Sequence, residues 1–279
     1  MKVEIEKSIA IIVLIFAALN IYAQDTLVIR SKYLKQPDTV LVYKPRHSTS
    51  DRKFPVVYLL HGYSEHYMQW SSIINLQQLA DQYGFAIVTP EGFATFYLNS
   101  PVDPSSQYED FFYEELVPKI HQLIPVDDKN IFISGLSMGG FGALYHFIRH
   151  TDYYNTAAAT SGALHIDPDE FLEYSFAFWK NDRLRRDAEK VFGDPKIYDW
   201  SSYKIIKLIK EYPDFNRAFL IDCGIEDPLY PLTEDLKKYC EVMNIPVTFM
   251  QAPGRHDGNY WHSSIEYHFV YFKQHLRKE

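Results

Sequence analysis

One serine of this 279-residue chain stands between two glycines, in the pattern Gly135-Leu-Ser137-Met-Gly139. A serine hydroxyl is a weak nucleophile by itself, and a strained strand-to-helix turn flanked by glycines is one way to expose it to a base. An apolar run at 130–134 precedes the serine, and a helical pattern follows at 139–150. The five-residue pattern alone occurs by chance in roughly one chain of this length in ten. Ser137 is therefore either a nucleophile or a small residue in a tight turn.

A nucleophilic serine needs a histidine as base and a carboxylate that orients it, and after this kind of turn they follow in the order serine, acid, histidine. Of the seven histidines after Ser137, His256 alone lies in a loop just beyond an apolar strand. The loop after the preceding strand carries Asp227, with Glu226 and Asp222 as alternatives. The order predicts His256 as the base and Asp227 as its partner, although a loop carboxylate is more often simply solvated.

Acyl transfer also needs two backbone amides that bind the developing oxyanion. After a nucleophile of this kind one amide comes from the next residue, here Met138, and the other from the turn after an early strand. That turn reads Leu-His61-Gly62-Tyr63, so Tyr63 is expected to present the second amide and His61 to be a structural partner. The chemistry requires no cofactor, and no cluster of His and Cys has metal-ligand spacing.

The scaffold that would position these residues follows from the hydrophobic pattern. Short apolar runs alternate with amphipathic segments, which predicts an α/β fold with a mostly parallel sheet covered by helices on both faces. In such sheets the ligand lies beyond the carboxyl ends of the strands. An antiparallel pair is expected at 26–31 and 39–43. The remaining strands are expected at 55–60, 85–89, 130–134, 156–160, 218–222 and 246–250, and the helices at 74–83, 109–123, 139–150, 203–211, 232–243 and 263–276.

The first 23 residues differ in kind from the rest. Lys2 and Lys7 precede a purely apolar run from Ile9 to Leu19, and a small residue, Ala23, stands at a suitable cleavage site. This is typical of a secretory signal peptide, and the run is too short for a comfortable transmembrane span. We expect residues 1–23 to be removed and the mature chain to be exported, to the periplasm or beyond, without stable membrane insertion. An uncleaved anchor is the alternative.

The mature chain, 24–279, has the length and composition of one globular domain, with 47% hydrophobic and 23% charged residues. A net charge of −8 without a Lys/Arg run argues against nucleic-acid binding. The least regular region, 164–215, is either a helical excursion that walls the site or a surface insertion. Cys223 and Cys240 are expected to be buried thiols rather than a disulfide. The oligomeric state stays open.

Together these motifs resemble the esterase D family of α/β-hydrolases, which includes S-formylglutathione hydrolases, tributyrin-type esterases, feruloyl esterase modules, siderophore esterases and secreted mycolyltransferases. Matching segments cover most of the mature chain: 31–34, 40–45, the Leu-Leu-His-Gly turn with Trp70, 96–101, 108–109, 115–118, 135–143, 223–227, and 256–257 with 260–261. The resemblance implies a single α/β-hydrolase domain in which Ser137 is the nucleophile and His256 is the base and then the acid. It also implies Asp227 as the orienting carboxylate and the amides of Tyr63 and Met138 as the oxyanion donors.

The expected activity is therefore that of a secreted serine carboxylesterase acting on short acyl or hydroxycinnamoyl esters, with carbohydrate esters among the substrates considered. The alternatives are an acyltransferase, a siderophore or thioester hydrolase, and a non-catalytic carbohydrate-binding protein. Export argues against S-formylglutathione, which is a cytosolic substrate. The chain is rich in aromatic residues, with 22 Tyr, 19 Phe and 4 Trp. We expect Trp70, Tyr97 and Trp261 near the cleft, although aromatic residues also fill cores.

Overall fold

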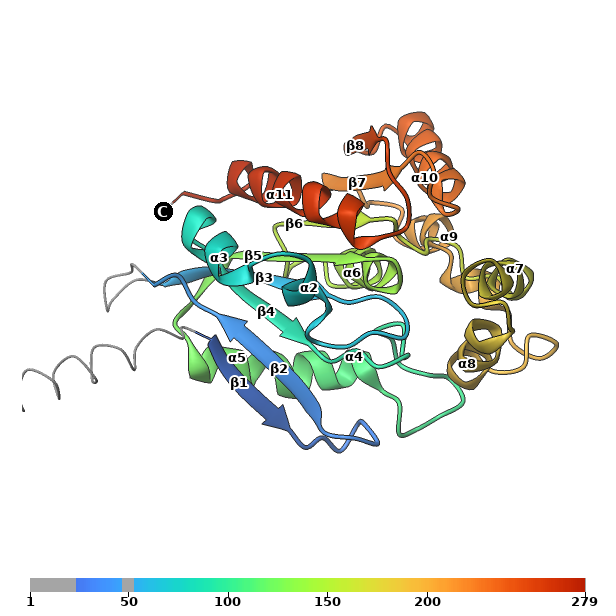
Figure 1. Ribbon diagram of the computed structural model, residues 1–279, viewed down its shortest axis with the longest axis horizontal. Helices are drawn as coiled ribbons and strands as arrows, with labels where there is room; N and C mark the ends of the chain where they lie inside the picture. Colours follow the sequence, from blue (N-terminus) through green and yellow to red (C-terminus); the bar gives the residue numbers. More distant parts are fainter. Residues whose placement is uncertain (1–23, 47–52, 279) are drawn as a thin grey trace, which may run out of the picture.

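The computed structural model describes residues 24–46 and 53–278, and the expected signal peptide lies outside them. An eight-stranded sheet runs through the described residues in the order β1-β2-β4-β3-β5-β6-β7-β8 (Figure 1). The strands are β1 (Gln24–Ile29), β2 (Asp38–Tyr43), β3 (Phe54–Leu60), β4 (Ala86–Pro90), β5 (Val126–Leu136), β6 (Thr156–Thr160), β7 (Phe219–Gly224) and β8 (Val247–Ala252). β2 is antiparallel to both β1 and β4, and all other neighbours are parallel. This is the sheet of an α/β-hydrolase.

Helices cover both faces of the sheet (Figure 1). One face carries α2 (Gln69–Ile73), α3 (Leu76–Tyr83) and α11 (Gly258–Gln274), whose apolar side chains form one of two core clusters. The larger cluster on the opposite face includes side chains of the other helices. These are α4 (Tyr108–Phe111), the π-helical turn η1 (Phe112–Leu116), α5 (Val117–Leu123), α6 (Met138–Arg149), α7 (Pro168–Trp179), α8 (Arg183–Phe192), the 3-10 turn η2 (Trp200–Tyr203), α9 (Ile205–Glu211) and α10 (Tyr230–Met243).

The central strands are buried on both faces, which is why they read as continuous apolar runs rather than as alternating patterns. All residues of β4 and β6 are buried, whereas the edge strand β8 is partly exposed throughout. The chain order reverses around β3, which has β4 on one side and β5 on the other. Leu60 pairs with Gly135 at the carboxyl ends of these strands. The loops that follow β3 and β5 therefore start side by side, at the place where such sheets bind ligands.

The expected elements are present, with shifted ends that have local causes. The helix expected at 109–123 contains the π turn η1, since Pro118 lacks the N–H that would bond one turn back. The last helix begins at Gly258 instead of 263 because the Asp257 side chain accepts from the amides of Asn259 and Tyr260. Within the described residues no helix is long and apolar enough to cross a membrane. Both cysteines are buried free thiols, as the sequence predicts.

Candidate active site

Ser137 occupies the turn between β5 and α6 with φ 53° and ψ −116°, a conformation that costs a non-glycine residue energy. Its amide donates to the carbonyl of Thr160 at 3.1 Å, and its carbonyl accepts from Ala163 at 3.0 Å. The helix start after this turn has no room for a side chain at position 139, because a Cβ there would lie 2.4 Å from the carbonyl oxygen of Leu60. The packing of α6 against β3 thus explains the glycine and projects the serine beyond the sheet.

The loops that follow β7 and β8 bring an acid and a histidine together. The Ile225 amide donates to the Ala252 carbonyl at 3.0 Å, and the Glu226 amide donates to the Gly254 carbonyl at 2.9 Å. A Cβ on Gly224 would lie 2.3 Å from that same Gly254 oxygen, so the two loops pack backbone to backbone. These contacts align residues that are far apart in the sequence.

The structure places Ser137, His256 and Asp227 in one hydrogen-bonded chain. His256 Nε2 lies 3.0 Å from Ser137 Oγ, and His256 Nδ1 lies 2.8 Å from Asp227 Oδ2. The other oxygen of Asp227 accepts from the Leu229 amide at 2.8 Å. Burial alone would raise the pKa of Asp227, but the bonds from His256 and from this amide outweigh it, so its pKa lies below the usual value. The acid therefore stays ionised and can stabilise a protonated imidazole.

The two alternative acids do not contact His256. Asp222 is buried and bonds His268 Nε2 at 2.5 Å and Thr160 Oγ1 at 2.8 Å, on the α11 side of the sheet. Glu226 pairs at 3.1 Å with Arg255, and both side chains are mostly exposed. Of these three carboxylates, the one that contacts His256 is Asp227, the residue that the sequence favoured.

Tyr63 and Met138 both line the cavity that contains Ser137 and His256. Met138 is the first residue of α6, so its amide has no acceptor within the helix and lies at the positive end of the helix dipole. The turn that carries Tyr63 is held on both sides. The Gly62 amide donates to Gln69 Oε1 at 2.8 Å, and His61 Nε2 accepts from the Gly92 amide at 2.7 Å. His61 is therefore a structural partner of the turn.

The cavity beside Ser137 is small and mostly apolar, with a volume of about 30 Å³. Rings and aliphatic side chains of the excursion at 164–215 form much of its wall, so this region lies over the site. The residues from α7 and α8 are Phe171, Tyr174, Phe178, Trp179 and Leu184. A space of this size holds one or two water molecules. The enclosed part of the site therefore accommodates only a small group.

The structure differs from the sequence expectation for two of the three aromatic residues that we placed near the cleft. Trp70 is 1% exposed and its indole donates to the Leu60 carbonyl at 2.8 Å. Tyr97 is fully buried and its hydroxyl donates to the His61 carbonyl at 2.9 Å. Each polar group finds a backbone acceptor in the core, so neither ring reaches the cavity. Trp261 does lie at the site, where its ring contacts His256 edge-on with centroids 5.0 Å apart.

Sequence reasoning missed the aromatic residues that do form the wall. Tyr174 and Phe178 are four residues apart on α7, so they share one face of that helix. The Phe178 ring lies 5.0 Å from the His256 ring, between centroids. The sequence does show that these two rings are spaced to share one face of a helix. Which face of α7 lies against the site is visible only in the structure.

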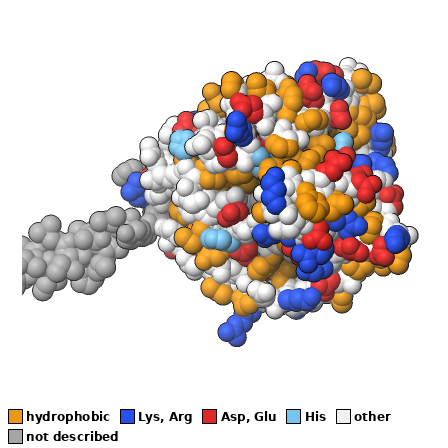
Figure 2. Space-filling model, turned by 45° about the vertical axis from the view of Figure 1, so that its right-hand side comes forward, with side chains coloured by type: hydrophobic (Ala, Val, Ile, Leu, Met, Phe, Trp, Pro, Cys, Tyr) orange, Lys and Arg blue, Asp and Glu red, His pale blue; other side chains and the backbone are white. Residues whose placement is uncertain are grey.

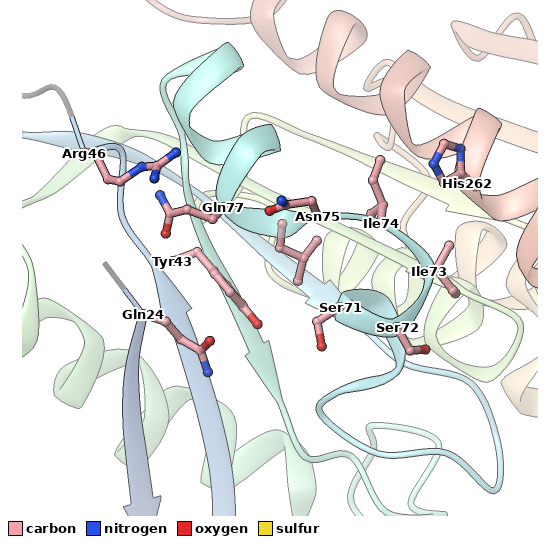
Figure 3. Close-up of a pocket in the computed structure, with 11 residues that line it drawn as sticks. Gln24, Tyr43, Arg46, Ser71, Ser72, Ile73, Ile74, Asn75, Gln77 and His262 are labelled. Carbon is pink, nitrogen blue, oxygen red and sulfur yellow. The ribbon is translucent and has the colours of Figure 1, made fainter. Parts of the chain in front are cut away.

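Larger hollows lie elsewhere on the described surface. One of about 630 Å³ lies beside α2 and β2, and Figure 3 shows Tyr43, Arg46 and Gln77 around it. Another of about 580 Å³ shares Ser72 and His262 with the first. Neither contains Ser137. Figure 2 turns the α7–α8 side forward, where Lys and Arg side chains alternate with Asp and Glu. No group of three metal-ligating side chains occurs in the described residues.

Known proteins are similar to this chain in sequence and in fold. The model of the Esterase family, described as "Putative esterase", matches residues 31–276. An acetyl esterase of Caldicellulosiruptor saccharolyticus is 29% identical over 84% of this chain and 92% of its own length. The S-formylglutathione hydrolase of Arabidopsis thaliana is 28% identical over 85% and 88%.

Solved structures show the same fold. The fluorophosphonate-binding serine hydrolase FphF of Staphylococcus aureus superposes with a TM-score of 0.77 at 22% identity, over 90% of this chain and 98% of its own. A ferulic acid esterase gives 0.75 at 24% identity, over 91% and 98%. The match to the family model covers nearly the whole described chain, so the protein belongs to the esterase family of α/β-hydrolases and is a serine hydrolase.

Proposed function

We propose that this protein is an exported carboxylesterase that removes a short acyl group, best fitted by acetyl, from an alcohol. The observation that carries the proposal is the cavity of about 30 Å³ beside Ser137, which rings from α7 close off. A hydroxycinnamoyl group has an aromatic ring and a three-carbon chain and is too large for this space. The cavity thus favours the short acyl groups among the substrates that the sequence left open. Support for export comes from the first 23 residues of the sequence.

In the proposed mechanism, His256 Nε2 accepts the proton of Ser137 as Oγ attacks the acyl carbonyl carbon. The carbonyl oxygen becomes an oxyanion, which the amides of Tyr63 and Met138 bind. The carbon–oxygen bond to the alcohol then breaks, and His256 returns the proton to the leaving oxygen. Water, deprotonated by His256, attacks the acyl-enzyme and releases the carboxylic acid and free Ser137. Asp227 remains ionised and holds the imidazole throughout.

A carbohydrate is the proposed alcohol part of the substrate. The hollow of about 580 Å³ is lined by Gln69, Trp261 and His262, among others. Gln69 supports the Tyr63 turn and Trp261 contacts His256, so this hollow adjoins the catalytic loops. Its lining includes amide, hydroxyl and imidazole groups and the carboxylate of Glu65, all of which can form hydrogen bonds to a ligand rich in hydroxyl groups.

A thioester of formic acid is the second candidate substrate, favoured by the same small cavity. The formyl group is smaller than acetyl, and relatives described as S-formylglutathione hydrolases are 27–28% identical to this chain. Acetylated sugars and S-formylglutathione differ in their leaving groups, so a comparison of kcat/KM between them separates the two proposals.

The proposed function is tested with a fluorophosphonate probe, followed by mass spectrometry of the mature chain, with Ser137→Ala as control. We expect the probe on Ser137, an N-terminus at Gln24, and loss of acetyl ester hydrolysis in the variant. A panel of esters from acetyl to hexanoyl and feruloyl should show the highest kcat/KM for acetyl. Full hydrolysis by Ser137→Ala would contradict the mechanism, and faster acyl transfer than hydrolysis with added sugar would support an acyltransferase instead.

A further inference from the structure

The residue that is proposed to supply an oxyanion amide also carries a side chain that is held from across the cavity. The Tyr63 hydroxyl donates to Asp187 Oδ2 at 2.6 Å, between the turn after β3 and helix α8. Arg183, one turn earlier on α8, places its guanidinium 5.4 Å from the centre of the Tyr63 ring and 5.5 Å from that of Trp179. Trp179 meets Tyr63 edge-on with ring centroids 5.2 Å apart. One ring is thus fixed by three side chains of the α7–α8 region.

The charges around this ring keep the hydroxyl a donor and the carboxylate an acceptor. Burial, together with the bond to Asp187, raises the pKa of Tyr63 to about 12. Burial alone would raise the pKa of Asp187, but the bonds from Lys190 and Tyr63 outweigh it and its pKa lies below the usual value. Lys190 bonds the other oxygen of Asp187 at 2.8 Å, on the solvent side. The bond between Tyr63 and Asp187 therefore persists over the whole neutral range.

The backbone next to Tyr63 needs external support. Ser64 has a φ of 66°, in the left-handed region that a non-glycine residue adopts at a cost. Such conformations persist only where the surroundings hold them. On the other side, the Gly62 amide is bonded to Gln69, so that end of the turn is already fixed. The peptide that carries the Tyr63 amide is held at its carbonyl, where the Gly62 oxygen lies 2.8 Å from His61 Nδ1 and accepts from the Glu65 amide at 3.3 Å. The Tyr63 ring, anchored on α8, holds the other end of that peptide at the Tyr63 Cα.

We propose that Asp187, assisted by Arg183, is a positioning residue that fixes the Tyr63 ring and thereby aims the Tyr63 amide at the oxyanion. Leu184 of helix α8 lines the cavity beside Ser137, which we call the acyl cavity. The bond to Asp187 then connects this helix to the turn that is proposed to supply the oxyanion amide. The inference rests on the proposed function, since it concerns the same oxyanion. It adds that the hydrogen bond from Tyr63 to Asp187 connects the cavity wall to the proposed oxyanion amide, so the sequence of α8 influences rate as well as substrate size.

The test compares Tyr63→Phe, Asp187→Ala and Asp187→Asn with a control, Asp182→Ala. Asp182 is an acidic residue on the N-terminal side of α8 whose carboxylate pairs only with the exposed Arg186 among the described residues. kcat and KM are measured with 4-nitrophenyl acetate, and binding with an alkyl boronic acid, which forms a tetrahedral adduct on serine. We expect Tyr63→Phe and Asp187→Ala to lower kcat about tenfold and to weaken boronate binding similarly, less than the 10²–10³ loss on removing a whole oxyanion donor. KM should change less than twofold.

Asp187→Asn retains an oxygen acceptor, and we expect it to keep most of the activity, as should Asp182→Ala. The double variant Tyr63→Phe/Asp187→Ala should be no slower than either single variant, because both remove the same bond. Wild-type kcat and boronate affinity in folded Tyr63→Phe and Asp187→Ala would overturn the inference, as would losses that add in the double variant. The proposed function is judged separately by Ser137 labelling: a labelled enzyme with unaffected Asp187 variants contradicts only the positioning role.

Discussion

The indole nitrogen of Trp261 donates to Ser161 Oγ at 3.1 Å, and this bond holds the indole ring edge-on against His256. Ser161 follows β6 with a φ of 49°, directly beside the Ser137 turn, since Thr160 accepts the Ser137 amide. The imidazole is thus confined by Trp261 and, through the Phe178 ring, by helix α7. His256 therefore has little freedom to leave the position from which its Nε2 reaches Ser137.

The first prediction concerns this confinement. Trp261→Phe keeps a ring beside His256 but removes the N–H that bonds Ser161, a hydrogen bond that contributes about 1 kcal/mol. We expect kcat to fall about threefold to tenfold, with KM nearly unchanged, because the imidazole spends less time aligned with Ser137. Steady-state kinetics with an acetyl ester measures the effect. Trp70→Phe is the matched control. The Trp70 indole bonds the Leu60 carbonyl in the core, so this variant should have a lower melting temperature and a nearly unchanged kcat.

A second prediction tests whether the cavity wall limits the acyl group. Leu184→Ala removes three carbons from the wall of the acyl cavity without touching the triad. We expect the ratio of kcat/KM for butyryl over acetyl esters to rise about tenfold, since each methylene in an apolar pocket changes specificity by about 1–3 kcal/mol. Leu172→Ala, on α7 but 39% exposed, makes the same chemical change away from the cavity and should leave the ratio unaltered. An unchanged ratio in Leu184→Ala would mean that other residues set acyl length.

The hydrogen-bonded chain of Ser137, His256 and Asp227 could be predicted from the sequence because its signals are local. The glycines around Ser137, the strand before it and the loops that carry Asp227 and His256 each reflect short-range steric demands of a turn. The sequence also predicts Asp227 rather than Asp222, but the contact that places it beside His256, the loop pairing between Glu226 and Gly254, is visible only in the structure.

The aromatic residues around the site could not be assigned in the same way. An aromatic ring looks alike in a sequence whether it fills the core or faces a cavity, and the difference depends on partners far along the chain. Tyr97 is buried because it lies against Gly142 of α6, where a Cβ would approach its ring to 2.5 Å. The α7 and α8 helices needed the structure too, because Lys180 ends α7 in a left-handed conformation and redirects the chain over the site.

Gly139 yields a third prediction, about folding rather than chemistry. A Cβ there would lie 2.4 Å from the Leu60 carbonyl oxygen, which is backbone and cannot turn aside. Gly139→Ala should therefore destabilise the fold by at least about 2 kcal/mol, as overpacking of close contacts does. Gly258→Ala, at the first turn of α11 with its nearest neighbour 3.5 Å away, should change stability by less than about 0.5 kcal/mol. Urea unfolding compares the two, and equal midpoints would contradict the steric account.

The hollow of about 580 Å³, which is proposed to bind the alcohol part of the substrate, is the subject of a fourth prediction. His262 is exposed and lies in the lining that the two neighbouring hollows share, outside the acyl cavity. If the alcohol part is a carbohydrate bound there, His262→Ala should raise KM severalfold for an acetylated oligosaccharide and leave 4-nitrophenyl acetate unaffected. Val270→Ala, at another exposed residue of α11 that lines neither hollow, serves as the control. Equal KM values for the oligosaccharide in the wild type and His262→Ala would place the alcohol elsewhere.

The buried Glu109 gives a final prediction, on stability against pH. Burial alone would raise the pKa of its carboxyl, but bonds from His150 at 2.7 Å and Arg149 at 2.8 Å outweigh burial and lower the pKa to about 2. An unfolded glutamate titrates near 4.3, so the carboxylate stabilises the fold fully above about pH 5 and loses this contribution as pH falls toward 2. Two pKa units correspond to about 3 kcal/mol.

Glu109→Gln should therefore lower the free energy of unfolding by about that much at pH 7. Urea unfolding should show the difference in this free energy between the variant and the wild type shrinking between pH 5 and pH 3. A difference that stays constant over this range would show that the side chain acts by packing rather than by its charge.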